Sequence, residues 1–213
     1  MGLFGNRIKV VFFDVGGVLI DADLDRYIPI CCAKLQATPE AVRREVSERV
    51  PALERGTMDS ETFWQEVGES LWRQGQGNLP DSHEFYRLWG DLLTSSLTIN
   101  SDVVKLCQLL RLNKIKLGLL TNAIAEHADI LTQRGIYSPF DPCIVSCRVG
   151  MRKPEADIYR LAASQAQVKP KECLLIDDQP ANVEAACKVG MEGIVFTNAA
   201  SLAQALWQRE LIK

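Results

Sequence analysis

Acidic, hydroxyl and basic side chains follow four separate apolar stretches of the sequence. They are Asp14 after KVVFF, Thr121-Asn122 at the end of KLGLLTN, Lys153 on the segment after CIVSC, and Asp177-Asp178 at the end of CLLIDD. Each alone has an ordinary explanation, such as a helix cap or an exposed surface charge. Two adjacent acids repel each other, however, unless a cation or solvent lies between them. Together, the four positions indicate one shared site.

These residue types suit phosphoryl transfer. Carboxylates are hard oxygen ligands for Mg²⁺, which usually takes one or two of them together with substrate phosphate. A lysine, a threonine hydroxyl and backbone N–H groups freed by glycines suit phosphate oxygens, and Gly16-Gly17 come shortly after Asp14. A carboxylate held beside the metal can attack phosphorus and form an aspartyl-phosphate. Catalysis in such a site is mostly positioning and charge neutralisation.

The elements that must position these residues form an alternating pattern. Apolar runs at 9–14, 116–121, 143–147, 173–177 and 193–196 are continuous, as expected of strands covered on both faces of a parallel sheet. Helical patterns with early proline or terminal glycine separate the later four. We therefore predict an α/β fold with a doubly wound, parallel, five-stranded Rossmann-like sheet, whose ligands bind beyond the carboxyl ends of its strands.

The long segment between the first two strands is predicted to be helical. Helices are predicted to start near Leu24, Pro39 (after a capping Thr38), Asp59 and Asp81, with a core helix from Ser101. Pro51, Gly56 and the stretch 75–80 are predicted breaks. We expect residues 1–19 and 98–213 to form the core and residues 20–97 to form a helical cap.

Composition limits the function classes. The 213 residues suit one domain with an insertion, and a net charge of −3 without a basic run argues against nucleic-acid binding. No apolar stretch approaches the roughly 20 residues that span a bilayer. Since MGLFGNR lacks a signal-peptide core, a cytoplasmic location is predicted. The seven cysteines form no paired zinc motif, and the oligomeric state is left open.

Four ordered segments resemble the motifs of the haloacid dehalogenase superfamily: FFDVGGVL, LLTN, GMRKP and LLIDDQPANVEAA. The spacing agrees across the whole core. The inserted segment resembles the helical cap (C1 type) of that superfamily, and LERGTMDSETF at 53–63 is typical of it. Within the superfamily the chain is most similar to the glucose-1-phosphatase-like group. The resemblance implies Mg²⁺-dependent hydrolysis of a small phosphorylated metabolite.

The resemblance also implies roles for single residues. Asp14 would be the nucleophile, and Thr121, helped by the Asn122 amide and the backbone of Gly16-Gly17, would bind the phosphoryl group. Lys153 would neutralise charge on both nucleophile and phosphate.

The implied metal ligands are Asp177, Asp178, Asp14 and the carbonyl of Gly16. If the paired acids bind metal, replacing either should weaken Mg²⁺ binding, and the loss of repulsion could stabilise the metal-free protein. Asn182 would support the last motif or lie on a helix surface.

Gly16 departs from the common pattern. Most phosphatases of the superfamily have an aspartate there as general acid and base, although the glucose-1-phosphatase-like group also shows glycine. Loss of a general acid lowers the reaction rate by about 10²–10⁴-fold. The loss is smallest for substrates with good leaving groups, such as anomeric sugar, acyl or aryl phosphates. Asp21 or Asp23 could deliver the proton, or both could be solvated turn acids.

Two other functions stay open. A haloacid dehalogenase also lacks the second acid, but it needs no Mg²⁺, so the doubled acid would have no purpose. A catalytically weak protein could hold phosphate and Mg²⁺ only to regulate a partner. A mutase is disfavoured because it needs the missing acid.

The cap is expected to select the substrate. Its aromatic residues recur near helical spacing, so most should be core and one or two could face the site: Phe63, Trp64, Trp72, Phe85, Tyr86 and Trp89. The roles of Arg26 and Cys31-Cys32 are left open.

Overall fold

A five-stranded parallel sheet forms the centre of the molecule. The computed structural model describes residues 8–21, 27–77 and 82–213. The strands are ordered β5-β4-β1-β6-β7. Their bounds are Val10–Phe13 (β1), Lys116–Thr121 (β4), Cys143–Val145 (β5), Cys173–Asp177 (β6) and Glu192–Val195 (β7). The predicted α/β class with its parallel sheet is confirmed.

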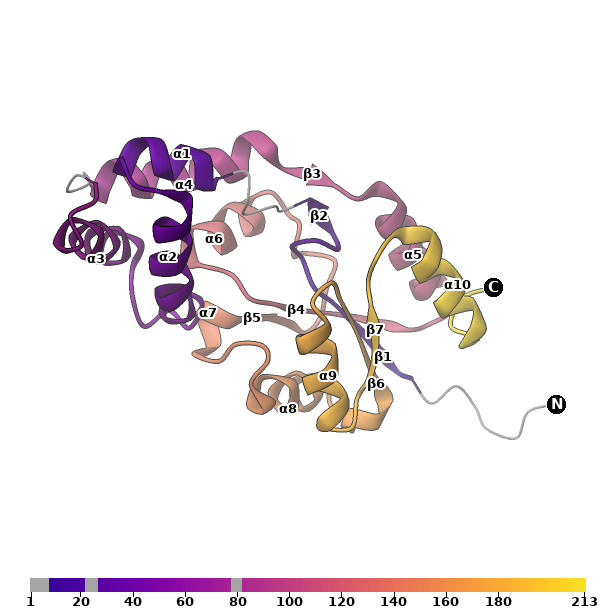
Figure 1. Ribbon diagram of the computed structural model, residues 1–213. Coiled ribbons are helices and arrows are strands. Elements are labelled where there is room, and N and C mark those ends of the chain that lie inside the picture. Colours follow the sequence, from indigo (N-terminus) through magenta and orange to yellow (C-terminus); the bar gives the residue numbers. More distant parts are fainter. Residues whose placement is uncertain (1–7, 22–26, 78–81) are drawn as a thin grey trace.

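Helices cover both faces of this sheet (Figure 1). α5 (Ser101–Leu112), α6 (Ala125–Gln133) and α10 (Ala199–Gln208) share one apolar cluster with Val11 and Phe13 of β1. α8 (Ala156–Gln165) and α9 (Pro180–Lys188) share the other with Val10 and Phe12. All four β1 side chains are fully buried. The run is continuously apolar because successive side chains enter two different cores.

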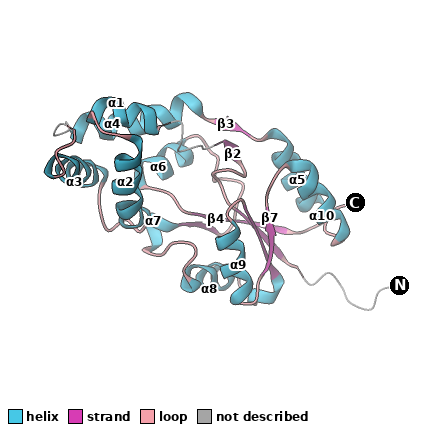
Figure 2. Ribbon diagram, in the orientation of Figure 1, coloured by secondary structure: helices cyan, strands magenta, loops and turns pink. Residues whose placement is uncertain are grey.

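A second group of helices lies between two short strands. β2 (Ile20–Asp21) and β3 (Thr98–Ile99) pair antiparallel where the chain leaves and rejoins the sheet. Between them come α1 (Ile28–Leu35), α2 (Pro39–Glu54), α3 (Ser60–Arg73) and α4 (Ser82–Ser96) (Figure 2). These helices enclose a third apolar cluster, which Ile124 from the segment after β4 also joins. The division into a core (1–19, 98–213) and a cap (20–97) stays a prediction that this arrangement supports.

Local sequence signals set several helix ends. The Thr38 hydroxyl accepts a hydrogen bond from the backbone N–H of Ala41 at 3.3 Å, and α2 begins at the next residue. Asp59 caps α3 in the same way, through Thr62 at 2.8 Å. The predicted starts near Leu24 and Asp81 fall outside the described residues, and the helices there are described from Ile28 and Ser82.

Two predicted boundaries were wrong. Pro51 does not break α2, which continues to Glu54. A proline removes one backbone donor, but its carbonyl still accepts, here from the Arg55 N–H at 3.2 Å, so helical hydrogen bonding resumes after it. Ser146 and Cys147 were expected to end a strand, but they begin the short helix α7 (Ser146–Val149). A 3-10 turn at Pro170–Glu172 (η2) precedes β6.

Of the six aromatic residues expected to be mostly core, four have described side chains, and three of these four are buried. Phe63, Trp64 and Phe85 are buried, and the ring centroids of Trp64 and Phe85 lie 4.6 Å apart. Trp72 is 60% exposed. The side chains of Tyr86 and Trp89 lie outside the described part of the structure. Among the described helices, none combines the length and the apolar character that a membrane span requires.

A buried acid joins α2 to the end of α3. Glu45 is 2% exposed, and its carboxylate accepts hydrogen bonds from Arg49 Nη1 and from Gln74 Nε2, each at 2.8 Å. Burial alone would raise the pKa of Glu45, but its hydrogen-bond partners lower it from an ordinary 4.5 to about 2. The anion is therefore more stable in the folded protein than in the unfolded chain.

We predict that Glu45→Gln lowers the free energy of unfolding at pH 7 by about 1.5–3 kcal/mol, the typical worth of hydrogen bonds to a charged group. Because the folded pKa is depressed, the contribution is present above pH 4.5 and is lost as the pH falls toward 2. Urea unfolding of wild type and variant at pH 7 and pH 3 should show the difference shrinking in acid. Glu48→Gln, at a side chain 60% exposed on the same helix, is the matched control and should leave stability nearly unchanged.

Candidate active site

The predicted site residues meet at the carboxyl ends of the three central strands. Asp14 follows β1, which lies between β4 and β6, and its N–H donates to the Ile176 carbonyl at 2.9 Å. Thr121 ends β4 and Asp177 ends β6. The strand order reverses at β1, which is where open α/β sheets bind ligands.

Lys153 lies at the centre of this group. Its ammonium nitrogen is 3.0 Å from Asp14 Oδ1 and 2.5 Å from Asp177 Oδ2. The lysine is 1% exposed and Asp177 is fully buried. Burial by itself would lower the pKa of Lys153, but the two carboxylates raise it above its ordinary value. The two carboxylates therefore favour the charged form of this buried lysine.

Lys153 neutralises the negative charge of Asp14 only in part. The Asp14 Oδ1 also accepts the N–H of Val15 at 2.7 Å. The pKa of Asp14 is raised from an ordinary 3.8 to about 6, because the effects of burial and of the Asp177 charge, which raise it, exceed the effect of Lys153, which lowers it. One ammonium does not fully compensate two buried carboxylates. The site thus favours the approach of a further cation.

The donor set fits a hard divalent cation. Carboxylate oxygens of Asp14, Asp177 and Asp178 all lie within 4.8 Å of one another. Such a cluster of hard oxygen donors suits Mg²⁺. The two adjacent acids differ in their contacts. Asp177 accepts from Gln179 N at 2.9 Å and from Asn182 Nδ2 at 3.0 Å, as well as from the lysine, whereas half-buried Asp178 accepts from the Gln179 side chain at 3.0 Å.

Gly17 makes room for the second acid. It adopts a φ of +73°, and a Cβ atom there would lie 2.5 Å from Asp178 Oδ2. A side chain at position 17 would therefore be strained and would displace the acid. Gly16 has no such positive φ among the described residues. Its carbonyl as a metal ligand, and the Gly16-Gly17 backbone as a phosphate ligand, stay predictions.

Asn122 holds the lysine segment in place. Its side-chain Oδ1 accepts the Lys153 N–H at 2.8 Å, and its Nδ2 donates to the Lys153 carbonyl at 3.0 Å. The side-chain amide predicted to help bind phosphate is thus engaged in positioning Lys153. Thr121 is buried beside it, at the end of β4.

Asn182 supports the site instead of lying on a helix surface. It is buried, and its carbonyl accepts the Tyr159 hydroxyl at 2.9 Å while its side chain holds Asp177. Asp21 is exposed on β2. Asp23 and Arg26 lie outside the described residues.

Sequence reasoning missed a contact between α2 and the site. Arg152 Nε lies 2.6 Å from Glu54 Oε2, which is also 3.4 Å from Asn122 Nδ2. Arg55 and Glu155 form a second ion pair between the same segments. Three of these four charged residues lie within LERG and GMRKP, and Glu155 directly follows GMRKP, but nothing in the sequence pairs residues about a hundred positions apart. The end of α2 therefore touches the residue before Lys153.

A family model described as haloacid dehalogenase-like hydrolase matches residues 8–190. The chain belongs to this family. Among curated relatives of this haloacid dehalogenase-like hydrolase, the sesquiterpene phosphatase astK of Aspergillus oryzae is 26% identical over 97% of this chain and 98% of its own length. The phosphorylated carbohydrates phosphatase of Thermotoga maritima is 26% identical over 88% of the chain and 84% of its own length. The predicted phosphoric monoester hydrolase class agrees with these relatives.

Other relatives are matched only in part. Flavin mononucleotide hydrolase 1 of Arabidopsis thaliana is 44% identical over 29% of this chain, which covers 25% of that protein. The chain likewise covers 23% of the bifunctional epoxide hydrolase 2 of Rattus norvegicus. It thus spans about a quarter of the length of these two relatives.

Solved structures share the fold. A predicted HAD-like family hydrolase from Porphyromonas gingivalis has a TM-score of 0.75 and 26% identity, covering 95% of this chain and 98% of that one. HAD family enzyme bt-2542 from Bacteroides thetaiotaomicron, in complex with magnesium and inorganic phosphate, has a TM-score of 0.69 and 24% identity, covering 89% and 94%.

We predict that the two adjacent acids of this haloacid dehalogenase-like hydrolase respond differently to replacement. Asp178→Ala should weaken Mg²⁺ binding, measured by calorimetric titration, and leave or raise the melting temperature of the metal-free protein, since it removes a repulsive charge. Asp177→Ala should lower that melting temperature, because it leaves Lys153 and Asn182 buried with unused donors. Unchanged Mg²⁺ titrations in both variants would remove the metal role.

Proposed function

We propose that this hydrolase is a Mg²⁺-dependent phosphatase, which hydrolyses a small phosphorylated metabolite through an aspartyl-phosphate at Asp14. The observation that carries the proposal is the Lys153 ammonium, buried between Asp14 and Asp177 beside a third acid. A buried carboxylate next to one cation and a divalent-cation donor set suits attack on a phosphate dianion. Two phosphatase relatives that align over most of their length support the same class.

The chemistry follows from the geometry. A carboxylate oxygen of Asp14 attacks phosphorus, and the bond between phosphorus and the ester oxygen breaks with its electron pair leaving on that oxygen. Water then attacks the aspartyl-phosphate, which releases inorganic phosphate and restores the carboxylate. Lys153 offsets negative charge on the nucleophile and on the phosphoryl oxygens. The Thr121 hydroxyl donates a hydrogen bond to a phosphoryl oxygen.

Mg²⁺, held by Asp14, Asp178 and Asp177 with the Gly16 carbonyl, would supply charge neutralisation to the phosphoryl group. The complex of bt-2542 with magnesium and phosphate is a property of that protein, but its fold is shared here. A dehalogenase that works without a metal would also not need two adjacent carboxylates such as Asp177 and Asp178 as metal ligands. A regulatory protein that only binds phosphate would not need the nucleophile intact.

Gly16 restricts the substrates of the proposed phosphatase. With no acid two residues after Asp14, the departing oxygen receives no proton from that position. We propose that good leaving groups are preferred, namely those of sugar-1-phosphates, acyl phosphates and aryl phosphates. The glucose-1-phosphatase-like grouping predicted from the motifs is consistent with this preference.

Asp14→Asn should lower turnover of p-nitrophenyl phosphate by at least about 10³-fold, because the amide keeps the shape but loses the nucleophile. Rapid quenching and peptide mass spectrometry should find a phosphoryl group on the Asp14 peptide of the wild type and none in the variant. Asp157→Asn, at an exposed acid on α8, is the matched control and should retain activity. Equal turnover in Asp14→Asn would refute the assignment.

Gly16→Asp should selectively increase turnover of substrates with poor leaving groups. A gain of up to about 10² for sugar-6-phosphates over p-nitrophenyl phosphate is expected, the low end of general-acid effects. Gly16→Asn has the same shape without the acid and should give no selective gain. Circular dichroism first checks that both variants fold. An equal shift for all substrates would show that another group already supplies the proton.

A further inference from the structure

A cavity of about 360 Å³ lies between the loop that joins α2 to α3 and the starts of α6 and α7. We call it the junction cavity. None of the candidate active-site residues is among the described residues of its wall, so it is a separate site. Its volume falls within the range of small-molecule sites. The residues that line it are Leu53, Gly56, Thr57, Met58, Asp59, Ser60, Ala125, Glu126 and Cys147.

The two sides of the junction cavity are in close contact. Gly56 has a φ of +67°, and a Cβ atom there would lie 2.4 Å from the Cys147 carbonyl oxygen. Arg55, which precedes Gly56, forms an ion pair with Glu155, just before α8. The walls of the cavity are therefore held in place relative to each other, as expected of a preformed binding site.

Two buried oxygen atoms of the cavity wall have no hydrogen-bond partner among the described residues. One is the hydroxyl of Ser60, a residue that is 2% exposed, and the other is Glu126 Oε2. The Tyr137 hydroxyl, which lies elsewhere, is the third such atom in the described part of the chain. Buried polar atoms are nearly always hydrogen-bonded. Two exceptions on one cavity indicate that their partner is a molecule bound within it.

The helix ends nearby do not supply this partner. Glu126 lies in the first turn of α6, where the helix dipole favours an acid, but the dipole gives Oε2 no hydrogen bond. Ser60 is the first residue of α3, and Asp59 already caps that helix by accepting the Thr62 N–H at 2.8 Å. The Ser60 hydroxyl is therefore not needed as a cap.

The charged side chains of the junction cavity are both acidic. They are Asp59 and Glu126, and no Lys or Arg is among the described residues of the lining. The hydrogen bond from the Thr62 N–H lowers the pKa of Asp59, so this carboxyl is an anion at neutral pH. Carboxylates accept hydrogen bonds and donate none. The cavity therefore favours a ligand that carries positive charge and hydrogen-bond donors.

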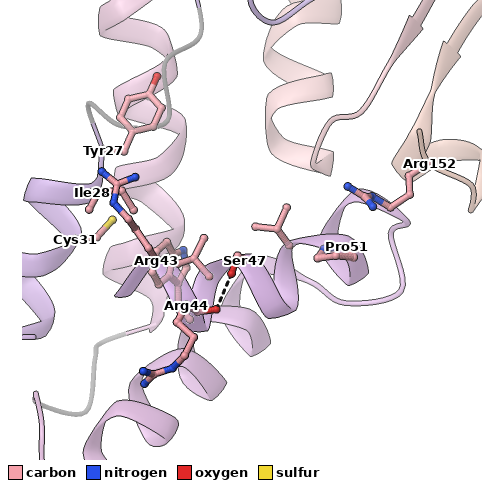
Figure 3. Close-up of a pocket in the computed structure, with 11 residues that line it drawn as sticks. Tyr27, Ile28, Cys31, Arg43, Arg44, Ser47, Pro51 and Arg152 are labelled. Atoms are coloured by element: carbon pink, nitrogen blue, oxygen red, sulfur yellow. Dashed lines mark hydrogen bonds between the residues drawn. The ribbon is translucent and has the colours of Figure 1, made fainter. Parts of the chain in front are cut away.

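The cavity between α1 and α2 has the opposite charge. Its volume is about 490 Å³, and Figure 3 shows Arg43, Arg44 and Arg152 in its wall. None of its described lining residues is an Asp or a Glu. A small cation would be repelled there and attracted to the junction cavity.

An organic cation suits the junction cavity better than a metal ion. A metal site needs several oxygen ligands around one point, and the one such cluster among the described residues is the Asp14 group, which includes neither Asp59 nor Glu126. The cavity has space beyond a single ion, and Leu53 and Met58 give it apolar surface. A primary ammonium group donates three hydrogen bonds and can carry an alkyl chain.

We infer that the junction cavity binds a small primary alkylamine in its protonated form. The ammonium group donates hydrogen bonds to the Ser60 hydroxyl and to Glu126, and the alkyl chain packs against Leu53 and Met58. Since the ligand would contact both the α2–α3 loop and α6, it would bridge these two parts of the protein. This site goes beyond the proposed phosphatase function and does not depend on it.

The test is calorimetric titration of the full chain with n-butylamine at pH 7, where the amine is protonated. Saturating Mg²⁺ is present so that the acids around Asp14 do not compete for the cation. Two probes separate the parts of the ligand: n-butanol has the chain without the charge, and tetramethylammonium has the charge without donors. We expect saturable binding of n-butylamine at one site, and at least about 10-fold weaker binding of both other probes.

Four variants locate the binding site. Glu126→Gln keeps the shape but loses the charge and should weaken n-butylamine binding at least about 10-fold. Ser60→Ala should weaken it about 5-fold and leave the melting temperature of the amine-free protein unchanged or higher, since this hydroxyl loses no partner. Glu66→Gln, at a side chain 47% exposed on α3, and Asp178→Ala, in the separate acid cluster, should bind the amine as the wild type does.

Chemical labelling gives a second, independent measurement. Cys147 lines the junction cavity and is half-buried, whereas Cys187 is exposed elsewhere. n-Butylamine should slow modification of Cys147 by methyl methanethiosulfonate and leave Cys187 unaffected, as measured by peptide mass spectrometry.

Three results would overturn the inference. Absence of saturable n-butylamine binding would show that the two oxygens are satisfied by water alone. Equal affinity for n-butanol or tetramethylammonium would show that the hydrogen-bonded ammonium group is not what the protein recognises. Binding that Glu126→Gln leaves unchanged would place the amine at a different site.

Discussion

The active-site architecture depends on one buried ammonium group. Lys153 is removed from water and held between Asp14 and Asp177, so every element that carries one of the three must be fixed to a fraction of an ångström. Separating such charges inside a protein is strongly unfavourable, because each would remain buried without its partner. The parallel sheet supplies the required rigidity, since β1 and β6 hold the two acids side by side. The same arrangement leaves an excess of negative charge, which a divalent cation would offset.

Contacts around the lysine extend this constraint outward. The Asn122 side chain hydrogen-bonds both the N–H and the carbonyl of Lys153, and Glu54 on α2 contacts Asn122 and Arg152. A displacement of α2 would therefore disturb the ion pair next to the lysine. This chain of contacts links the helices after β2 to the charge balance at Asp14. The helices after β2 and the buried charges at Asp14 therefore share one mechanical support.

The features that could be predicted from the sequence are those that a short local pattern specifies, such as buried strands and helix caps. A continuous apolar run ending in an acid predicts a buried strand with its acid at the sheet edge, and Asp14 and Asp177 both obey this rule. The capping role of Thr38 is equally local. The clamp by Asn122 and the ion pair of Arg152 could not be predicted, because they join residues from distant segments whose approach is set by tertiary packing. Resemblance to a family supplied the roles of the residues but not these supporting contacts.

The missing acid at position 16 limits the substrates that the proposed phosphatase can use. An alkoxide that departs without a proton carries a full negative charge, which makes it a poor leaving group. An aromatic leaving group spreads the charge over its ring and needs no proton. Glycine at position 16 therefore favours esters whose oxygen is already a stable anion when the bond to phosphorus breaks.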